Sequence, residues 1–483
     1  MDKKHLPALI SVSFLIVVFS FTSHNTKSFY KNSLTDTTAP LAIKAKDHMG
    51  RSVVSTSGAI TFTTGLENDF YQVDSVNKTS HLYMEAKLAK FINDNVKRIP
   101  LNISVVIDRS GSMQGVKLGF AKKAAKNIID QLKSEDMVSL VIYDNDVDTI
   151  QSPVNVIEKE KIKAKIDAIG PRGSTNLWGG TEQGYQFVKR NFKPGYVNRV
   201  LLISDGLANV GITDSNLIRI KVQKFKDDEG ISLSTFGVGL DYNETLMTDM
   251  AETGAGNYYF IDAPEKMTSI FNNELSGLLN VAAQNAELKI KIPAGVTIQK
   301  GYPLQFQQNG NEVTIRLRDL SSEETKASLF TFKIADKTSG VLKFTSTLTY
   351  TDVTDGQQKT LTNENLLSPV KNVDAYLTHF NKKVIEQTIL FTANETLETA
   401  MNLMDKGDYN SARQYLNQNK DFLKANAIYV TADGNNVLMQ MDSLNTNYMK
   451  SSQSFSAISP DSVKALKKTM RASNYQIRNK KQN

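Results

Sequence analysis

Residues 105–113 read VVIDRSGSM, and in this stretch an apolar run stops abruptly at an acid that is followed by two hydroxyl side chains. A short apolar run bounded by turn-forming residues predicts a strand that is buried on both faces, as in a parallel sheet covered by helices. Ligands of such sheets gather at the carboxyl ends of the strands. That end carries Asp108, Ser110 and Ser112, and Gly111 allows a tight turn between them. These oxygen ligands predict a site for a hard cation such as magnesium or manganese.

The spacing D-x-S-x-S after a buried strand resembles the metal-ion-dependent adhesion site (MIDAS) of von Willebrand factor type A (VWA) domains. The other parts of that site follow along the chain, because Thr175 lies in the stretch GSTNL and Asp205 follows the apolar run RVLLIS. The resemblance implies that Ser110, Ser112 and Thr175 bind the ion directly, whereas Asp108 and Asp205 hold it largely through waters. It also implies Mg2+ as the ion, with Mn2+ and Ca2+ as alternatives, and an open position for an Asp or Glu carboxylate of another protein. For the first loop alone, the alternative is a plain helix start with Ser112 as its N-cap.

Strands and helices alternate across residues 101–282, which predicts a doubly wound, Rossmann-like α/β sheet. Residues 144–148 read DNDVD and predict a polar hairpin turn rather than a calcium loop, because the Gly and Glu that such a loop needs are missing. Arg109 replaces the more usual small residue of the metal loop, and we expect a solvated loop arginine or, alternatively, a contact with an acidic partner. Trp178 is either a contact anchor at the rim of the site or a core residue of a helix start.

Alternating apolar residues predict an antiparallel β-sandwich on both sides of the α/β region. One half-buried strand is expected at residues 82–88, and four more lie between residues 286 and 352. Because the first strand has no neighbour of its own, we expect that it completes the sandwich and that the VWA domain is inserted between the strands. The predicted domains are a signal peptide at 1–27, a linker with possible strands at 28–80, a β-sandwich from 81–100 with 284–352, the VWA domain at 101–282 and a helical C-terminal domain at 370–476.

The N-terminus has the layout of a signal peptide, with Lys3 and Lys4 before an apolar run at residues 6–21. We therefore expect an exported protein of the periplasm or cell surface, with an uncleaved membrane anchor as the alternative. This order of parts is similar to that of bacterial exported proteins described as calcium-activated chloride channel homologues, although no second apolar run suits a channel. The basic tail from Lys464 onward is expected to be a solvated helix face, with contact to an acidic surface as the alternative.

The composition limits the classes of function. The chain has no cysteine, which excludes disulfides, thiolate metal sites and cysteine nucleophiles. A net charge of +7 is modest for 483 residues, and without a recognition motif we expect no nucleic-acid partner. No histidine lies between His81 and His379, and no catalytic motif of a hydrolase is present.

The expected function is a non-enzymatic, metal-dependent adhesion or scaffold module of the cell envelope. One alternative is a metal-assisted hydrolase in which Asp144 or Asp214 is the base. The other is a purely structural metal site, with partner binding through the helical C-terminal region.

Overall fold

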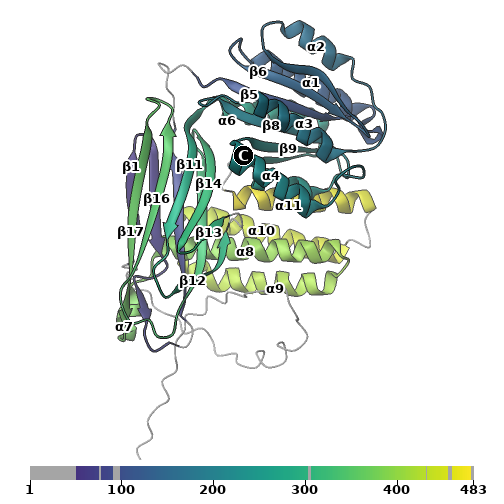
Figure 1. Cartoon of the computed structure of the whole chain (residues 1–483). Helices are drawn as coiled ribbons and strands as arrows, with labels where there is room; N and C mark the ends of the chain where they lie inside the picture. Colours follow the sequence, from purple (N-terminus) through teal and green to yellow (C-terminus); the bar gives the residue numbers. More distant parts are fainter. Residues whose placement is uncertain are drawn as a thin grey trace, which may run out of the picture.

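The computed structural model describes residues 50–75, 78–90, 98–302, 306–430, 432–454 and 459–479. Within these ranges the chain forms an α/β domain, a β-sandwich and a helical region, which pack against one another (Figure 1). The predicted signal peptide and the first part of the predicted linker lie outside the described residues.

The α/β domain is built on a mostly parallel sheet with the strand order β10-β9-β8-β5-β6-β7, in which β7 is antiparallel to β6. Its strands are β5 (Leu101–Asp108), β6 (Met137–Tyr143), β7 (Val147–Asn155), β8 (Val197–Ser204), β9 (Ser232–Val238) and β10 (Ala255–Ile261). Its helices are α1 (Val116–Gln131), α2 (Lys159–Asp167), α3 (Leu177–Arg190), α4 (Ser215–Glu229), α5 (Glu244–Thr253) and α6 (Met267–Leu279), with the 3-10 turns η1 (Gly111–Met113) and η2 (Pro264–Lys266). The prediction of a doubly wound sheet is confirmed.

The central strand β5 is buried on both faces because successive side chains enter different cores. Val105 and Ile107 pack into the core under α1, α2 and α6, whereas Val106 packs into the core under α3, α4 and α5. The sequence predicts that a helix closes this domain at about residue 282, but α6 ends at Leu279 and a strand begins at Val281. The short step from helix to strand carries the chain directly back into the sandwich.

The sandwich consists of a sheet with the order β1-β2-β4-β15-β12 and a sheet with the order β13-β14-β11-β16-β17-β3. Its strands are β1 (Val53–Ser57), β2 (Ile60–Leu66), β3 (Phe70–Gln72), β4 (Thr79–Leu88), β11 (Val281–Lys291), β12 (Val296–Tyr302), β13 (Gln307–Asn309), β14 (Glu312–Ser321), β15 (Thr325–Ile334), β16 (Leu342–Asp352) and β17 (Gln358–Val370). The strands extend beyond the predicted ranges, because β1 to β3 lie in the predicted linker and β17 follows residue 352.

The strand expected at residues 82–88 pairs with strands on both sides of the α/β domain in sequence. β4 is antiparallel to β2 and to β15, with Leu82 opposite Phe330 in the latter pair. The prediction that this strand is half-buried holds for its second half, where Lys87 is exposed, but not for Tyr83, which is fully buried with Val384 and Phe391 of α8. A neighbouring helix therefore covers the face that alternation alone assigns to solvent.

The helical region follows β17 and comprises α7 (Val373–Thr378), α8 (Lys382–Asp405), α9 (Tyr409–Asn426), the 3-10 turn η3 (Ala427–Tyr429), α10 (Ala432–Ser454) and α11 (Pro460–Arg478). The apolar pattern of this region predicts helices at 373–393 and 395–405, but the break comes earlier, where Asn381 caps the start of α8. Asn394, at the expected break, lies buried inside α8 and bonds to Tyr302 and Asn474. A buried polar network therefore replaces the expected helix end.

The last helix, α11, packs on the α/β domain and also on α8 and α10 (Figure 1). Lys464 pairs with Asp241 of the α/β domain at 2.8 Å, and Lys468 is buried with its ammonium 3.4 Å from the centre of the Tyr242 ring. The expectation of a solvated basic face was therefore wrong for Lys468, which is buried, whereas Lys464 stays half exposed. Basic side chains on this helix meet acidic and aromatic partners from distant parts of the chain.

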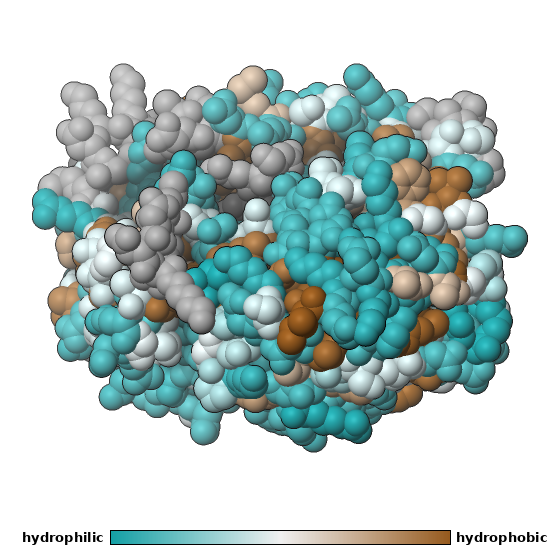
Figure 2. All heavy atoms as spheres, turned by 90° about the horizontal axis from the view of Figure 1, so that it is seen from above, coloured by the Kyte–Doolittle hydropathy of each residue, from teal (hydrophilic) through white to brown (hydrophobic). Residues whose placement is uncertain are grey.

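The surface that is seen from above in Figure 2 is largely hydrophilic, and apolar areas on it are small and separate. Within the described residues, none of the helices combines the length and the apolar character that a membrane crossing requires.

Candidate metal centre

The predicted ligands lie together where β5 and β8 end and where α3 begins. Asp108 is the last residue of β5, Asp205 follows β8, and Thr175 precedes the N-cap of α3. Asp108 and Asp205 are fully buried, and Ser110 and Thr175 are nearly so, whereas Ser112 is exposed. The cluster is thus walled by protein on one side and open to solvent at Ser112.

The spacing of the oxygens fits a small, hard cation. Ser110 Oγ lies 3.1 Å from Ser112 Oγ, and Ser112 Oγ lies 2.8 Å from Asp205 Oδ1. Oxygens that occupy adjacent positions around Mg2+, each at about 2.1 Å from the ion, are about 3 Å apart. Within the described residues no group of three or more His, Cys, Asp or Glu side chains could hold a metal, so this centre depends on hydroxyls for a complete ligand set.

Gly206 shows how closely the remaining oxygens converge. A Cβ atom at this position would lie 2.8 Å from Thr175 Oγ1 and 3.4 Å from Asp108 Oδ2. Any side chain there would crowd the threonine hydroxyl, so glycine keeps this wall of the site clear. Hydroxyl and carboxylate oxygens that surround a cleared space are the donor set that Mg2+ or Mn2+ prefers, and the residues present therefore fit such an ion.

Asp108 is held by hydrogen bonds that leave it behind the hydroxyl ligands. Its Oδ1 accepts from the Ser110 backbone N–H at 2.8 Å, and its Oδ2 accepts from the Ser204 hydroxyl at 2.7 Å. Burial raises the pKa of Asp108 to about 6, the bonds from Ser110 and Ser204 oppose this rise, and the charge of Asp205 adds to it. A cation in the site would favour the charged form of this carboxylate. Ser204 was not predicted, and its one signal is that it is a polar residue at the end of an apolar strand.

Thr175 is fixed by reciprocal bonds with the loop that follows Asp205. Its N–H donates to Asn209 Oδ1 at 2.8 Å, and its carbonyl accepts from the N–H groups of Asn209 and Val210 at 3.1 and 3.2 Å. Asn176, the next residue, caps α3 by accepting from the Gly179 N–H at 3.0 Å. The loop of Thr175 and the loop of Asp205 are therefore held together by these hydrogen bonds. The role of Asn209 was not predicted from the sequence.

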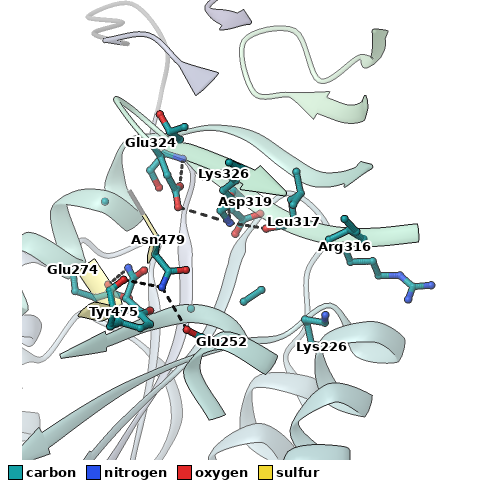
Figure 3. Close-up of a pocket in the computed structure, with 18 of the residues that line it drawn as sticks. Lys226, Glu252, Glu274, Arg316, Leu317, Asp319, Glu324, Lys326, Tyr475 and Asn479 are labelled. Carbon is teal, nitrogen blue, oxygen red and sulfur yellow. Dashed lines mark hydrogen bonds and ion pairs between the residues drawn. The ribbon is translucent and has the colours of Figure 1, made fainter. Parts of the chain in front are cut away.

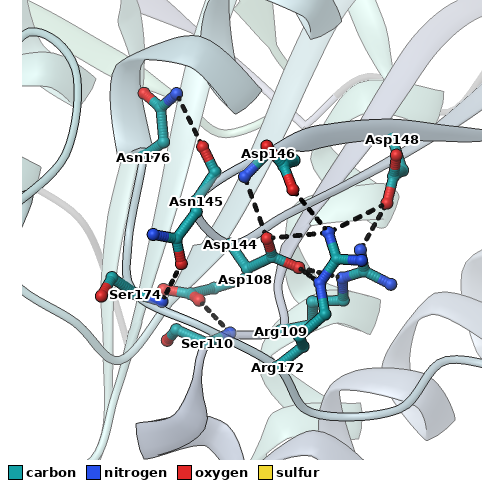
Figure 4. Close-up of polar contacts among 10 residues, drawn as sticks. All are labelled: Asp108, Arg109, Ser110, Asp144, Asn145, Asp146, Asp148, Arg172, Ser174 and Asn176. Carbon is teal, nitrogen blue, oxygen red and sulfur yellow. Dashed lines mark hydrogen bonds and ion pairs between the residues drawn. The ribbon is translucent and has the colours of Figure 1, made fainter.

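An arginine–aspartate cluster lies beside the centre (Figure 4). Asp144 accepts from Arg109 Nε at 2.6 Å, from Arg172 Nε at 2.8 Å and from the Asp146 N–H at 2.9 Å, and Arg109 also pairs with Asp148. Burial alone would raise the pKa of Asp144, but Arg172, the Asp146 N–H and Arg109 together hold this pKa below its ordinary value. The expectation that Arg109 is a solvated loop residue was wrong, since its side chain is 13% exposed and paired twice.

The same cluster connects the loops that carry the predicted ligands. The Gly111 N–H donates to the Gly173 carbonyl at 2.9 Å, and the Arg172 N–H donates to the Arg109 carbonyl at 2.8 Å. The acids at 144–148 belong to a hairpin turn in which Tyr143 pairs with Val147, as predicted. The cluster thus sets the separation between the loop of Ser110 and Ser112 and the loop of Thr175.

Trp178 belongs to the core and not to the rim of the site. It is 2% exposed and packs in the cluster under α3 and α4, with Lys221 5.5 Å from its ring centre. The interpretation as a contact anchor was therefore wrong. The amphipathic start of α3 turns this ring toward the sheet.

A cavity of about 140 Å3 lies elsewhere, where the α/β domain, the sandwich and α11 meet (Figure 3). Its charged groups are largely bound to other parts of its wall. Glu274 pairs with Arg199 at 3.0 Å, and Lys326 donates to the carbonyls of Leu317 and Asp319 at 2.6 and 2.8 Å. These contacts occupy charged groups of the cavity wall within the α/β domain and within the sandwich, and the cluster at Asp108 remains the candidate functional site.

Comparison with known proteins identifies the α/β domain. Residues 102–273 match the family model of the von Willebrand factor type A domain. The predicted VWA domain is thereby confirmed for this part of the chain.

Curated relatives match part of this chain. The chain is 36% identical over 199 residues to the uncharacterized protein YfbK of Escherichia coli, a match that covers 41% of this chain and 34% of that protein. It is 30% identical over 174 residues to inter-alpha-trypsin inhibitor heavy chain H2 of Mesocricetus auratus, covering 34% of this chain and 18% of that one. The matched stretches thus span about a third or less of these two relatives. Neither relative is named as an enzyme.

A solved structure extends the similarity of fold beyond the VWA domain. The von Willebrand factor type A protein of Catenulispora acidiphila superposes with a TM-score of 0.65 at 14% identity, and the match covers 81% of this chain and 91% of that one. At this identity the match shows the fold alone, and it includes parts on both sides of the VWA domain.

Proposed function

Because the chain carries a VWA domain, and such domains are commonly metal-dependent protein-interaction modules, we propose that this one captures another protein through a bound cation. Mg2+ at Asp108, Ser110, Ser112, Thr175 and Asp205 binds an Asp or Glu carboxylate of the partner at its open position. The protein acts as an exported adhesion or scaffold module of the cell envelope. Mn2+ and Ca2+ are the other ions that these oxygen ligands suit.

The observation that carries this proposal is the oxygen cluster that opens at Ser112. Two buried carboxylates oppose the two positive charges of the ion, so an incoming carboxylate meets little net repulsion. Two exposed apolar side chains lie close in sequence to the ligands, since Val116 follows the loop of Ser112 and is 62% exposed, and Leu207 follows Asp205 and is 55% exposed. A protein partner could contact this apolar surface while its carboxylate binds the cation, whereas a small anion could not use the apolar surface.

The hydrolase alternative has little support from the two candidate bases. Asp144 already accepts from two arginines and from a backbone N–H, and its lowered pKa makes it a poor proton acceptor. Asp214 accepts from the Leu217 N–H at 2.7 Å as the N-cap of α4. Both carboxylates are thus occupied in maintaining the fold.

The alternative of partner binding through the helical region is also less favoured. Lys464, Lys468 and Arg471 of its last helix contact Asp241, Tyr242 and Asp405. Basic groups that would attract an acidic partner therefore have partners within the chain.

The test measures metal binding and partner capture with the full chain. Thr175→Ala removes a neutral ligand and should weaken partner capture from an envelope extract while the fold stays nearly as stable. Asp205→Ala also removes a charge and should abolish metal binding more completely. Chelator should reproduce both losses without unfolding the domain, and Mn2+ should restore capture better than Zn2+.

Thr149→Ala is the matched control, because Thr149 is an exposed threonine in β7 of the same sheet. It should bind metal and partner as the wild type does. Capture that is unchanged by chelator and by both site substitutions would overturn the proposal and leave the metal site structural.

A further inference from the structure

Lys117 reaches into the candidate metal centre from the first turn of α1. Its ammonium lies 2.5 Å from Asp205 Oδ2, while Ser112 occupies the other oxygen of the same carboxylate. Asp205 is fully buried and the lysine side chain is 26% exposed, so the pair lies at the mouth of the site. The sequence pattern of the metal loop gives no sign of this contact.

The position of Lys117 is not explained by the stability of its helix. A positive charge in the first turn of a helix is unfavourable, because the free N–H groups already make that end positive. Asp205 therefore has to offset this repulsion. The contact points to a role at the metal centre rather than in α1.

The surrounding backbone leaves room for the lysine. Gly239 has φ +74°, and a Cβ there would lie 3.0 Å from Lys117 Cε and 3.3 Å from its Nζ. The loop after β9 thus has no side chain at Gly239 that would displace Lys117. The pKa of Asp241, a residue of the same loop, is lowered mainly by Lys464 and to a smaller extent by Lys117. The Lys117 ammonium is therefore close enough to act on the Asp241 carboxylate as well as on Asp205.

We propose that Lys117 is an internal competitor of the metal ion. Its ammonium holds Asp205 when the centre has no ion, and it leaves Asp205 Oδ2 when a divalent cation binds. This inference rests on the proposed function and concerns the regulation of the same site. Its reason is electrostatic, because an ammonium and a divalent cation repel each other at such short range and both require the same carboxylate.

The competition predicts that removal of the ammonium strengthens metal binding. In titrations of the full chain with Mn2+ alone, followed by electron paramagnetic resonance of the free ion at low ionic strength, Lys117→Met should bind at least about tenfold more tightly than the wild type. Lys117→Arg keeps the charge and should stay close to the wild type. In chelator, Lys117→Met should melt at a lower temperature than the wild type because Asp205 loses its partner. Addition of Mn2+ should raise the melting temperature of Lys117→Met by more than it raises that of the wild type.

Lys126→Met is the matched control, because Lys126 lies on the same helix and pairs with Asp167 at the surface, 2.6 Å away. It removes the same charge far from the centre and should change Mn2+ affinity by less than about twofold, since exposed charges are screened. Lys117→Gln provides a second neutral variant if Lys117→Met does not fold.

Two results would overturn the inference in distinguishable ways. If Asp205→Ala abolishes Mn2+ binding but the neutral Lys117 variants bind no more tightly than Lys126→Met, Lys117 is a structural partner and the metal centre stands. If neither the wild type nor the neutral Lys117 variants bind Mn2+, or if Asp205→Ala binds it as the wild type does, the proposed metal centre falls together with this inference.

Discussion

Asp144 connects two of the loops that carry the predicted metal ligands, through Arg109 and Arg172. Replacing it with Asn removes the charge that two arginines share, and we expect a loss of about 3 kcal/mol in the free energy of unfolding, typical of a broken buried ion pair. Metal affinity should fall too, because the loops of Ser110 and Thr175 lose one of the contacts that connect them. Urea unfolding and Mn2+ titration measure both effects. Asp146→Asn, at an exposed side chain of the same turn, is the control and should change stability by about 0.5 kcal/mol or less.

The lowered pKa of Asp144 also sets a pH dependence with a defined sign. A carboxyl whose folded pKa lies below its ordinary value of 3.8 adds stability above that value, and this contribution is lost as the pH falls further. The stability difference between the wild type and Asp144→Asn should therefore shrink below about pH 4. A difference that stays constant down to pH 3 would contradict this assignment.

Glu244 should show the opposite dependence. Burial raises its pKa from 4.5 to about 7, against the opposing charges of Lys468 and Arg471. The folded state thus binds more protons than the unfolded state between these values, so this residue makes stability fall as the pH rises from 4.5 to 7. Glu244→Gln should remove that slope in urea unfolding at pH 5, 6 and 7. Parallel pH profiles for the two proteins would show that Glu244 keeps an ordinary pKa.

The sequence located the residues of the candidate site better than it located their partners. Asp108 and Asp205 could be placed together because the carboxyl ends of parallel neighbouring strands meet at one edge. The contacts of Arg109 and Lys117 could not be predicted, because an ion pair between loops depends on side-chain directions that no periodic pattern encodes. For the same reason Trp178 was given two interpretations, and only its burial decided between them.

At the scale of elements, α11 joins the helical region to the VWA domain. Tyr475 is 3% exposed, its ring packs edge-on to Tyr258 with 5.5 Å between centres, and its hydroxyl accepts from the Tyr258 N–H at 3.1 Å. Tyr475→Ala should lower the free energy of unfolding by about 3–5 kcal/mol, as for other buried aromatic residues. Tyr475→Phe keeps the ring and should lose about 1–2 kcal/mol.

Urea unfolding distinguishes these effects from a general weakening of the helix. Lys464→Ala removes an exposed ion pair of the same helix and should cost less than about 1 kcal/mol. Equal losses for Tyr475→Ala and Lys464→Ala would mean that the buried ring of Tyr475 contributes no more to stability than an exposed ion pair of the same helix.

The elements themselves were largely predictable, and their surroundings were not. The apolar stripe of an amphipathic helix predicts a helix at 177–190, and this range coincides with α3, which Asn176 caps. The basic face of α11 and the outer face of β4 were both assigned to solvent. Each is covered in part by an element that is distant in sequence, and local composition carries no information about such a neighbour.

At the scale of the molecule, the VWA domain is an insertion whose two junctions meet. The Ser322 N–H donates to the Asn280 carbonyl at 2.9 Å, and the adjacent Glu323 N–H donates to the Ala89 carbonyl at 3.5 Å. The chain thus leaves the sandwich and returns to it at a single turn. This arrangement agrees with the inference drawn from the unpaired alternating strand.

The insertion predicts which fragments fold. Residues 286–352 alone should not fold, because β15 loses its neighbour β4 and β16 loses its neighbour β17, which leaves exposed strand edges. A chain in which a short glycine–serine linker replaces residues 90–279 should unfold cooperatively in urea, since the two junctions are adjacent. A soluble, cooperatively melting 286–352 fragment would contradict the first expectation, and aggregation of the linked chain would contradict the second.

The separation between these junctions and the metal centre has a mechanical consequence. The domain is anchored at the start of β5, whereas a partner would be held just beyond its other end at Asp108. Tension between partner and anchor then runs along β5, which is bonded in register to β6 on one side and β8 on the other. Extracting this strand requires both ladders to shear at once, whereas an edge strand can peel away bond by bond. In single-molecule pulling, the bond to the partner should therefore rupture before the VWA domain unfolds.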